Sequence, residues 1–264
     1  MTESVVLVEQ RNHTLIVTIN RPKAANSINA DVHRGLGEAW ERAESDRDVR
    51  AVILTGAGES VFCGGADLKA LGTAGPDGVT PPETAHWGFA GVVKHHISKP
   101  VIAAVNGTAL GGGTELALAS DLVVASETSE FGLPEVHRGL IAGAGGVFRI
   151  GQAVPRAIAM ELILTGKPMS ADDALRWGLV NRVVPRTDVL ATALELAELV
   201  AAGAPLAVQS SKTVARGIID GHIPAEDQAW ELSEKALARL TTSADTLEGV
   251  MAFMQKRAPV WKGE

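Results

Sequence analysis

The chain has 264 residues, 46% of them hydrophobic, and a formal net charge of −7. This length is sufficient for one large core or for a core with a smaller appendage. The acidic balance, the 4% aromatic content and the absence of tyrosine argue against a nucleic-acid or anionic-membrane surface. Cys63 is the single cysteine, MTESVVLVEQ lacks the features of a secretory signal and no apolar run is long enough to span a bilayer, so we expect a cytoplasmic protein.

The first part of the chain alternates apolar runs with helix-like segments. The expected strands are residues 5–10, 14–20, 49–56, 101–107 and 121–126. Helices are expected over 31–45, where apolar residues share one face, and over 85–98. Residues 71–84 are rich in Gly and Pro and predict a loop. Strands alternating with helices to about residue 185 predict an α/β core.

From Thr187 onward the sequence is almost wholly helical. The last helix carries an apolar face made of Leu247, Val250, Met251 and Met254. We therefore divide the chain into a core, 1–186, and a helical region, 187–264. Such a region either packs on a neighbouring subunit or covers the core of its own chain.

Two loops share one construction, a buried strand followed by glycines and a helix. They read VILTG…CGGADLKAL and VIAAVNGTALGGGTELAL. Helix N-termini present unpaired N–H groups, and two that face each other can stabilise one developing oxyanion. Tight helix–strand packing, which also favours glycine, is the alternative explanation.

Two glutamates follow the second loop. Glu115 is expected in the first turn of its helix, and Glu135 lies in the largely apolar stretch EFGLPEVHRGL. Each alone is explained by helix-dipole complementation or by a surface position. Together they can return to one pocket, and paired carboxyl groups suit proton transfers at two adjacent atoms.

Several segments resemble the enoyl-CoA hydratase (crotonase) family in order over nearly the whole chain. They are INRPKAANSIN, VILTGAGESVFCGGADLKAL, KPVIAAVNGTALGGGTELALASD, FGLPEVHRGLIAGAGG, LTGKPMSADDALRWGLVNRVV and EGVMAFMQKRAPVWKG. The resemblance implies an α/β crotonase-like spiral of strand–strand–helix units, followed by a C-terminal helical trimerisation region. It also implies an acyl-CoA thioester substrate, a homotrimer or homohexamer, and neither a metal nor a cofactor apart from the CoA of the substrate.

The resemblance also assigns roles to residues. It places the oxyanion-hole N–H groups on Ala66 and Gly112, and makes Glu115 and Glu135 the catalytic acids. Glu115 would help activate water at C3, and Glu135 would deliver or remove the proton at C2. The residues that would contact the CoA thioester are Lys23, Ala24 and Ala25, then Ala66, Asp67, Leu68, Lys69 and Gly112, and finally Phe253 and Lys256. The last two would approach the adenine and phosphate of a CoA bound in the same chain or in a neighbouring subunit.

Because both acids are present, the expected activity is hydration of a 2-enoyl-CoA to the 3-hydroxyacyl-CoA. Double-bond isomerisation and dehydration of a carnitinyl thioester are the nearest alternatives within the family. A non-catalytic acyl-CoA-binding scaffold is the alternative of another class, although such a scaffold does not need two acids.

Overall fold

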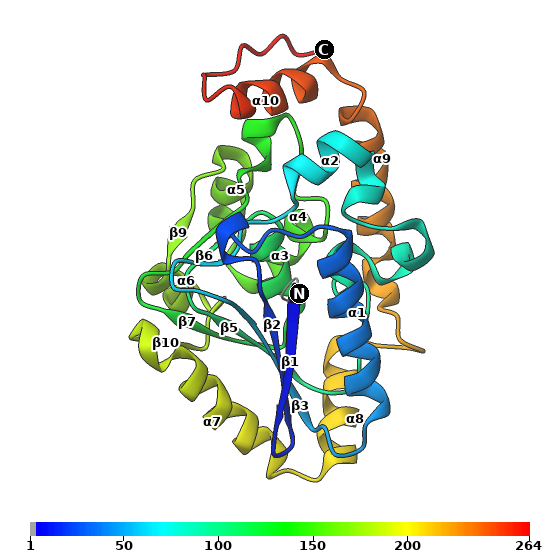
Figure 1. Cartoon of the computed structure of the whole chain (residues 1–264), viewed down its shortest axis with the longest axis vertical. Coiled ribbons are helices and arrows are strands. Elements are labelled where there is room, and N and C mark those ends of the chain that lie inside the picture. The colour runs from blue at the N-terminus through cyan, green and yellow to red at the C-terminus, as the bar shows by residue number, and fades with distance from the viewer. Residues whose placement is uncertain (1–3) are drawn as a thin grey trace.

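The computed structural model of the chain describes residues 4–264 and is drawn in Figure 1. Its strands are β1 Val6–Arg11, β2 Thr14–Ile19, β3 Ala51–Gly56, β4 Val61–Cys63, β5 Val101–Val105, β6 Thr108–Leu110, β7 Leu122–Ser126, β8 Glu130–Gly132, β9 Met169–Ser170 and β10 Arg182–Val184. Its α-helices are α1 Ala30–Ser45, α2 Leu68–Ala74, α3 Gly112–Ala119, α4 Gly146–Ala153, α5 Arg156–Thr165, α6 Ala171–Trp177, α7 Val189–Ala201, α8 Pro205–Arg216, α9 Asp227–Leu240 and α10 Ala244–Met254. Its 3-10 helices are η1 Pro22–Ala24, η2 Gly75–Gly78, η3 Pro82–Trp87, η4 Phe89–Gly91, η5 Pro134–Arg138, η6 Arg186–Asp188 and η7 Pro224–Glu226.

A six-stranded sheet forms the centre of the molecule. Its order is β1-β2-β3-β5-β7-β10, with β1 antiparallel to β2 and the other pairs parallel. The strands β3 and β5 are buried along their whole length, as their continuous apolar runs predict. All five predicted strands are therefore confirmed.

The two faces of this sheet have separate apolar cores. One face packs against α7, where Ala193 and Ala197 meet Ile53, Ile102 and Val124. The larger core lies on the other face and includes Trp40 of α1. In Figure 1, α7 runs below the sheet. The first helix of the region 187–264 thus covers the core of its own chain, whereas the division of the chain at 186 stays a prediction.

A second, smaller sheet positions the glycine loops. It has the order β4-β6-β8-β9, and the strands β4, β6 and β8 are parallel. The glycine loops follow β4 and β6, and Glu135 follows β8 on η5. Because the carboxyl ends of parallel strands meet at one edge, these three connections converge.

Two predictions between residues 71 and 98 were wrong. The expected loop 71–84 contains the end of α2, η2 and the first half of η3, because Asp67 caps α2 and a proline stands in the first or second position of each 3-10 helix. The expected helix 85–98 is replaced by the end of η3, by η4 and by turns. Gly88 and Gly91 both have a φ of 71°, which interrupts an α-helix there.

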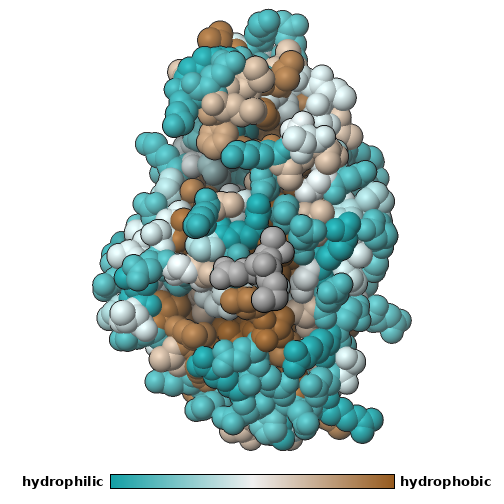
Figure 2. All heavy atoms as spheres, viewed as in Figure 1, coloured by the Kyte–Doolittle hydropathy of each residue, from teal (hydrophilic) through white to brown (hydrophobic). Residues whose placement is uncertain are grey.

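The last helix, α10, is confirmed, and its apolar face points outward. Leu247 is 67% exposed and Met254 is 64% exposed, whereas Gly249 and Ala252 face the protein. Figure 2 shows apolar atoms among the hydrophilic ones at the end of the molecule where α10 lies. In residues 4–264 no single helix could cross a membrane; α7 with its preceding turn and α8 reach the required length and composition only as a pair bent by 105°.

Candidate active site

Two loops bring two free backbone N–H groups to the wall of one cavity. Ala66 forms an isolated parallel bridge with Ile28, and Gly112 opens α3 directly after Gly111. A Cβ atom on Gly65 would lie 3.1 Å from the Gly112 nitrogen, so the loops are in contact. In the described part of the chain, neither the Ala66 nor the Gly112 N–H donates to a backbone carbonyl. Both residues line the cavity, where the two N–H groups can serve one oxyanion.

The three consecutive glycines are each required by a close approach or by backbone shape. Gly111 has a φ of 54°, a left-handed value. A Cβ on Gly112 would lie 2.4 Å from the ring of Phe89, and a Cβ on Gly113 would lie 2.0 Å from the carbonyl oxygen of Cys63. Tight packing therefore explains Gly113, while Gly112 also borders the cavity.

Glu115 lies in the first turn of α3, as predicted, and is 4% exposed. The Gly146 N–H donates to its Oε1 atom at 2.9 Å. Burial and, after it, the nearby Glu135 raise the pKa of Glu115, and the hydrogen bond from Gly146 opposes this rise. A carboxyl group with a raised pKa can hold a proton near neutral pH and donate it.

Glu135 approaches the same cavity from η5. Its Oε1 atom lies 2.7 Å from the position that a Cβ on Gly111 would take. Its Oε2 atom is buried and has no hydrogen-bond partner in residues 4–264. Burial raises the pKa of Glu135. Because Glu115 and Glu135 interact, they titrate as a pair, and one shared proton makes one of them an acid and the other a base.

These groups line a cavity of about 550 Å³, a size typical of small-ligand sites. Six residues predicted for the site line it: Ala66, Leu68, Gly112, Glu115, Glu135 and Phe253. Its walls are mainly apolar and include Phe89, Val93, Leu140 and Ile141. The cavity can therefore hold an apolar group while presenting two acids and two N–H donors.

The segments expected to contact CoA lie beside each other. Lys23 and Ala24 belong to η1. The next residue, Ala25, accepts the N–H of Gly64 at 2.9 Å, and Gly64 belongs to the loop that carries Ala66. Lys23 and Lys69 are both exposed. Their contact with CoA stays a prediction.

Asp67 has a structural task. Its side chain accepts the N–H groups of Lys69 and Ala70 at the start of α2 and pairs with Arg21 at 2.8 Å. Burial opposes ionisation of Asp67, but the bonds from Arg21 and the backbone outweigh it and lower its pKa. The Asp67 carboxylate therefore holds the loop that carries Ala66.

The C-terminal pair lies at two adjoining hollows, and Phe253 lines both of them. Phe253 lines the large cavity of its own chain, and the Arg138 guanidinium lies 4.1 Å from its ring centroid. Lys256 lies in a neighbouring hollow of about 260 Å³ that also contains Arg138 and Arg257. Whether Phe253 and Lys256 contact CoA stays a prediction.

Sequence reasoning missed several residues of the site. Arg138 brings a cation to the cavity, and Trp230 of α9 closes one side of it. Arg138 follows Glu135 by three positions in PEVHR, so the motif held a signal for it. Nothing in the sequence links Trp230 or Gly146 to Glu115, because these contacts depend on how α9 and α4 pack.

Comparison with known proteins decides the family. The family described as Enoyl-CoA hydratase/isomerase matches residues 9–264. The chain belongs to the enoyl-CoA hydratase/isomerase family.

Similar members of this family include a carnitinyl-CoA dehydratase of Proteus mirabilis (strain HI4320), 42% identical over 259 residues and covering 96% of each chain. A crystal structure of a carnitinyl-CoA hydratase from Mycobacterium avium is 54% identical, with a TM-score of 0.97 over 100% of both chains. A crystal structure of an enoyl-CoA hydratase from Mycobacterium tuberculosis H37Rv is 43% identical, with a TM-score of 0.76 over 99% of this chain and 100% of that chain. These matches confirm the crotonase fold expected from the sequence.

Proposed function

We propose that the chain is a hydro-lyase that removes water from a 3-hydroxyacyl-CoA of the carnitinyl type and adds water in the reverse direction. The observation that carries the proposal is the convergence of Glu115, Glu135 and the free N–H groups of Ala66 and Gly112 on one cavity. A cavity that only bound acyl-CoA would gain nothing from two buried carboxyl groups, whose charged forms burial disfavours.

The mechanism follows from the placement of these groups. The thioester oxygen accepts hydrogen bonds from the Ala66 and Gly112 N–H groups, which stabilise the enolate formed when the C2 proton leaves. Glu135 takes the C2 proton on its free Oε2 atom. Protonated Glu115 gives its proton to the C3 hydroxyl group, the C3–O bond breaks, and water leaves. Transfer of one proton from Glu135 to Glu115 then restores the starting pair.

The carnitinyl assignment is supported by the names of the relatives and by one corner of the cavity. Trp230 and Glu234 both line the cavity, and they offer an aromatic face and a carboxylate to a trimethylammonium group. This corner already holds a cation, because Lys94 Nζ lies 4.3 Å from the Trp230 ring centroid and 2.9 Å from Glu234 Oε1.

The Lys94 contact also favours a second candidate, hydration of an uncharged short-chain 2-enoyl-CoA. When Lys94 occupies the corner, its ammonium group repels a second cation. A carnitinyl substrate therefore requires the flexible Lys94 side chain, which is 32% exposed, to turn toward solvent. An uncharged acyl chain requires no such movement.

The test compares two thioesters that differ only in the cationic group, carnitinyl-CoA and 3-hydroxybutanoyl-CoA. We expect kcat/KM for dehydration to be at least about tenfold higher for carnitinyl-CoA, since a cation over a desolvated aromatic ring gains about 2 kcal/mol. Equal or better use of 3-hydroxybutanoyl-CoA would replace the proposal with the second candidate. Tight binding of both without any turnover would indicate a scaffold.

We also propose that the chain forms a trimer or a hexamer. The helical region leaves large apolar side chains exposed, including Leu206 at 77%, Val214 at 81% and Leu247 at 67%. An exposed apolar surface of this kind marks an interface between proteins. Light scattering at micromolar concentration tests the proposal, and a monomeric mass would contradict it.

A further inference from the structure

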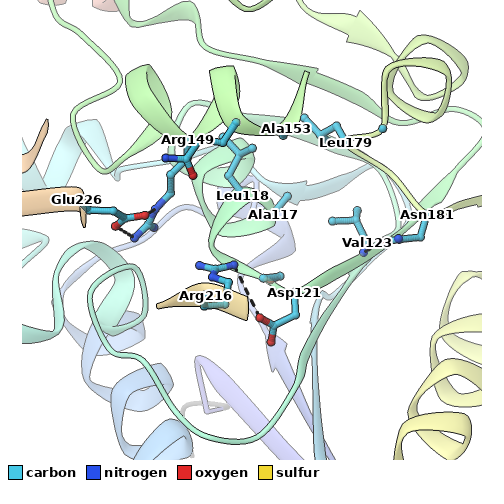
Figure 3. Close-up of a pocket in the computed structure, with 13 residues that line it drawn as sticks. Ala117, Leu118, Asp121, Val123, Arg149, Ala153, Leu179, Asn181, Arg216 and Glu226 are labelled. Atoms are coloured by element: carbon cyan, nitrogen blue, oxygen red, sulfur yellow. Dashed lines mark hydrogen bonds and ion pairs between the residues drawn. The ribbon is translucent and has the colours of Figure 1, made fainter. Parts of the chain in front are cut away.

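A buried ion pair lines a second cavity, and the ring of Trp230 beside it lines the catalytic cavity. Arg149 and Glu226 line this second cavity of about 240 Å³, which Figure 3 shows. Arg149 Nε donates to Glu226 Oε1 at 3.0 Å, and its Nη2 donates to Oε2 at 2.6 Å. The two side chains are 3% and 6% exposed. A bidentate pair of this kind fixes both direction and distance.

Aromatic rings hold the guanidinium group in place. The Arg149 guanidinium carbon lies 5.3 Å from the Trp230 ring centroid and 5.7 Å from that of Phe148. The two rings meet edge to face at 5.0 Å, and Trp230 Nε1 donates to Glu226 Oε2 at 3.2 Å. The arginine, the glutamate and Trp230 therefore form one connected unit.

Each end of the pair leads to the catalytic cavity. Arg149 belongs to α4, and the first residue of that helix, Gly146, donates its N–H to Glu115. Glu226 immediately precedes α9, which contributes Trp230 and Leu237 to the cavity wall. The α9 helix also packs on the segment before α4, since a Cβ on Gly143 would lie 2.4 Å from Leu237.

We propose that Arg149 and Glu226 are positioning residues that clamp α9 onto α4 and so hold the Gly146 N–H against Glu115. The pair acts on the reaction through Glu115 and touches no substrate atom. This inference rests on the acid–base role proposed for Glu115. It does not depend on the identity of the acyl group.

The charged and titratable groups around the clamp define its electrostatics. Glu135 and Cys63 lie near Glu115, and His96 lies near Arg149 and Glu226. Asp121 and Arg216 line the second cavity together with the pair. Arg149 slightly lowers the pKa of Glu115 by its charge, a smaller effect than burial and the Gly146 hydrogen bond. Charge and positioning therefore make opposite predictions for Glu226→Gln.

If Arg149 acts by its charge, Glu226→Gln leaves the arginine uncompensated and lowers the pKa of Glu115. If the pair positions Gly146, the same variant loosens the hydrogen bond and raises that pKa. We expect the rise, and a fall in kcat of about 10²-fold with KM little changed, since a shift of about 1 Å at a catalytic group has that effect. Arg149→Lys keeps the positive charge but cannot donate two parallel hydrogen bonds to Glu226, so it should have the same effects on the Glu115 pKa and on kcat.

The experiment follows the Glu115 carboxyl carbon by NMR in protein labelled at the glutamate carboxyl group, with Glu115→Gln to assign the signal. This readout needs no substrate, so it decides the positioning proposal even if the proposed dehydration fails. Arg216→Met is the matched control. It removes a cation from the same cavity, but Arg216 faces Asp121 at 3.7 Å and lies on α8 (Figure 3).

A double variant separates positioning from folding. Arg149→Met with Glu226→Leu replaces the buried pair by apolar side chains, which often preserves stability. We expect it to fold with a raised Glu115 pKa and reduced kcat. Normal titration and kcat in this variant, or a lowered pKa in Glu226→Gln, would overturn the proposal.

Discussion

Gly113→Ala tests the contact that joins the two oxyanion loops. Gly113 lies inside α3, where alanine gains about 1 kcal/mol of helix propensity over glycine. A Cβ there would lie 2.0 Å from the Cys63 carbonyl oxygen and 2.9 Å from its carbon, whereas ordinary contact begins at 3.4 Å. Because the atoms in the way belong to the backbone, the loops must separate by about 1 Å. Overpacking of this kind lowers the free energy of unfolding by about 1–3 kcal/mol.

The separation moves the Gly112 N–H away from the Ala66 N–H. A donor displaced by about 1 Å loses much of its effect, so we expect kcat to fall about 10²-fold. Calorimetry and steady-state dehydration kinetics measure the two effects. Gly151→Ala is the control, because Gly151 is a helical position in α4 with nothing within 4 Å of an added Cβ, and it should be neutral or stabilising. Wild-type Tm and kcat in Gly113→Ala would refute the reasoning.

Four further outcomes are expected. Glu115→Gln and Glu135→Gln should each lower turnover at least about 10²-fold while saturated acyl-CoA still binds, and the double variant should lose far less than the product of the single losses; oxygen-18 exchange from water into the hydroxyacyl product checks this. The pH profile of turnover should be bell-shaped around the raised pKa values of Glu115 and Glu135. Ionising a buried carboxyl group with a raised pKa destabilises the folded state, so the Tm of the wild type should fall relative to that of the double Gln variant as pH rises through these raised pKa values. Lys94→Met should increase kcat/KM for carnitinyl-CoA relative to 3-hydroxybutanoyl-CoA in paired assays. Truncation after Thr241 should weaken both assembly in light scattering and CoA affinity in calorimetry.

The long elements could be predicted from the sequence because each leaves a local signal, whereas the roles of the two acids came from the family resemblance. Continuous apolar runs identify the buried strands β3 and β5, and the spacing of apolar residues identifies α1. Strands of two or three residues, such as β6 and β9, are too short to show a period of two. The structure identifies β6 and β9 as strands because both pair with β8.

The candidate site was predictable where one loop carries it. Glu115 and Gly112 belong to a single loop and helix, so their proximity follows from the chain itself. The Gly146 N–H meets Glu115 across 31 positions, and Trp230 reaches the cavity through the packing of α9. Contacts of that kind depend on tertiary geometry, which no local pattern encodes.

Both acids, Glu115 and Glu135, line the cavity from the same chain, as do Trp230 of α9 and Phe253 near the end of α10. Within an oligomer, a defective subunit then has no intact copy of its missing acid to borrow. Chains carrying Glu115→Gln and chains carrying Glu135→Gln should not complement each other when they are co-assembled. Activity should instead be proportional to the fraction of intact chains in the oligomer. An inactive chain would then not lower the activity of the intact chains assembled with it.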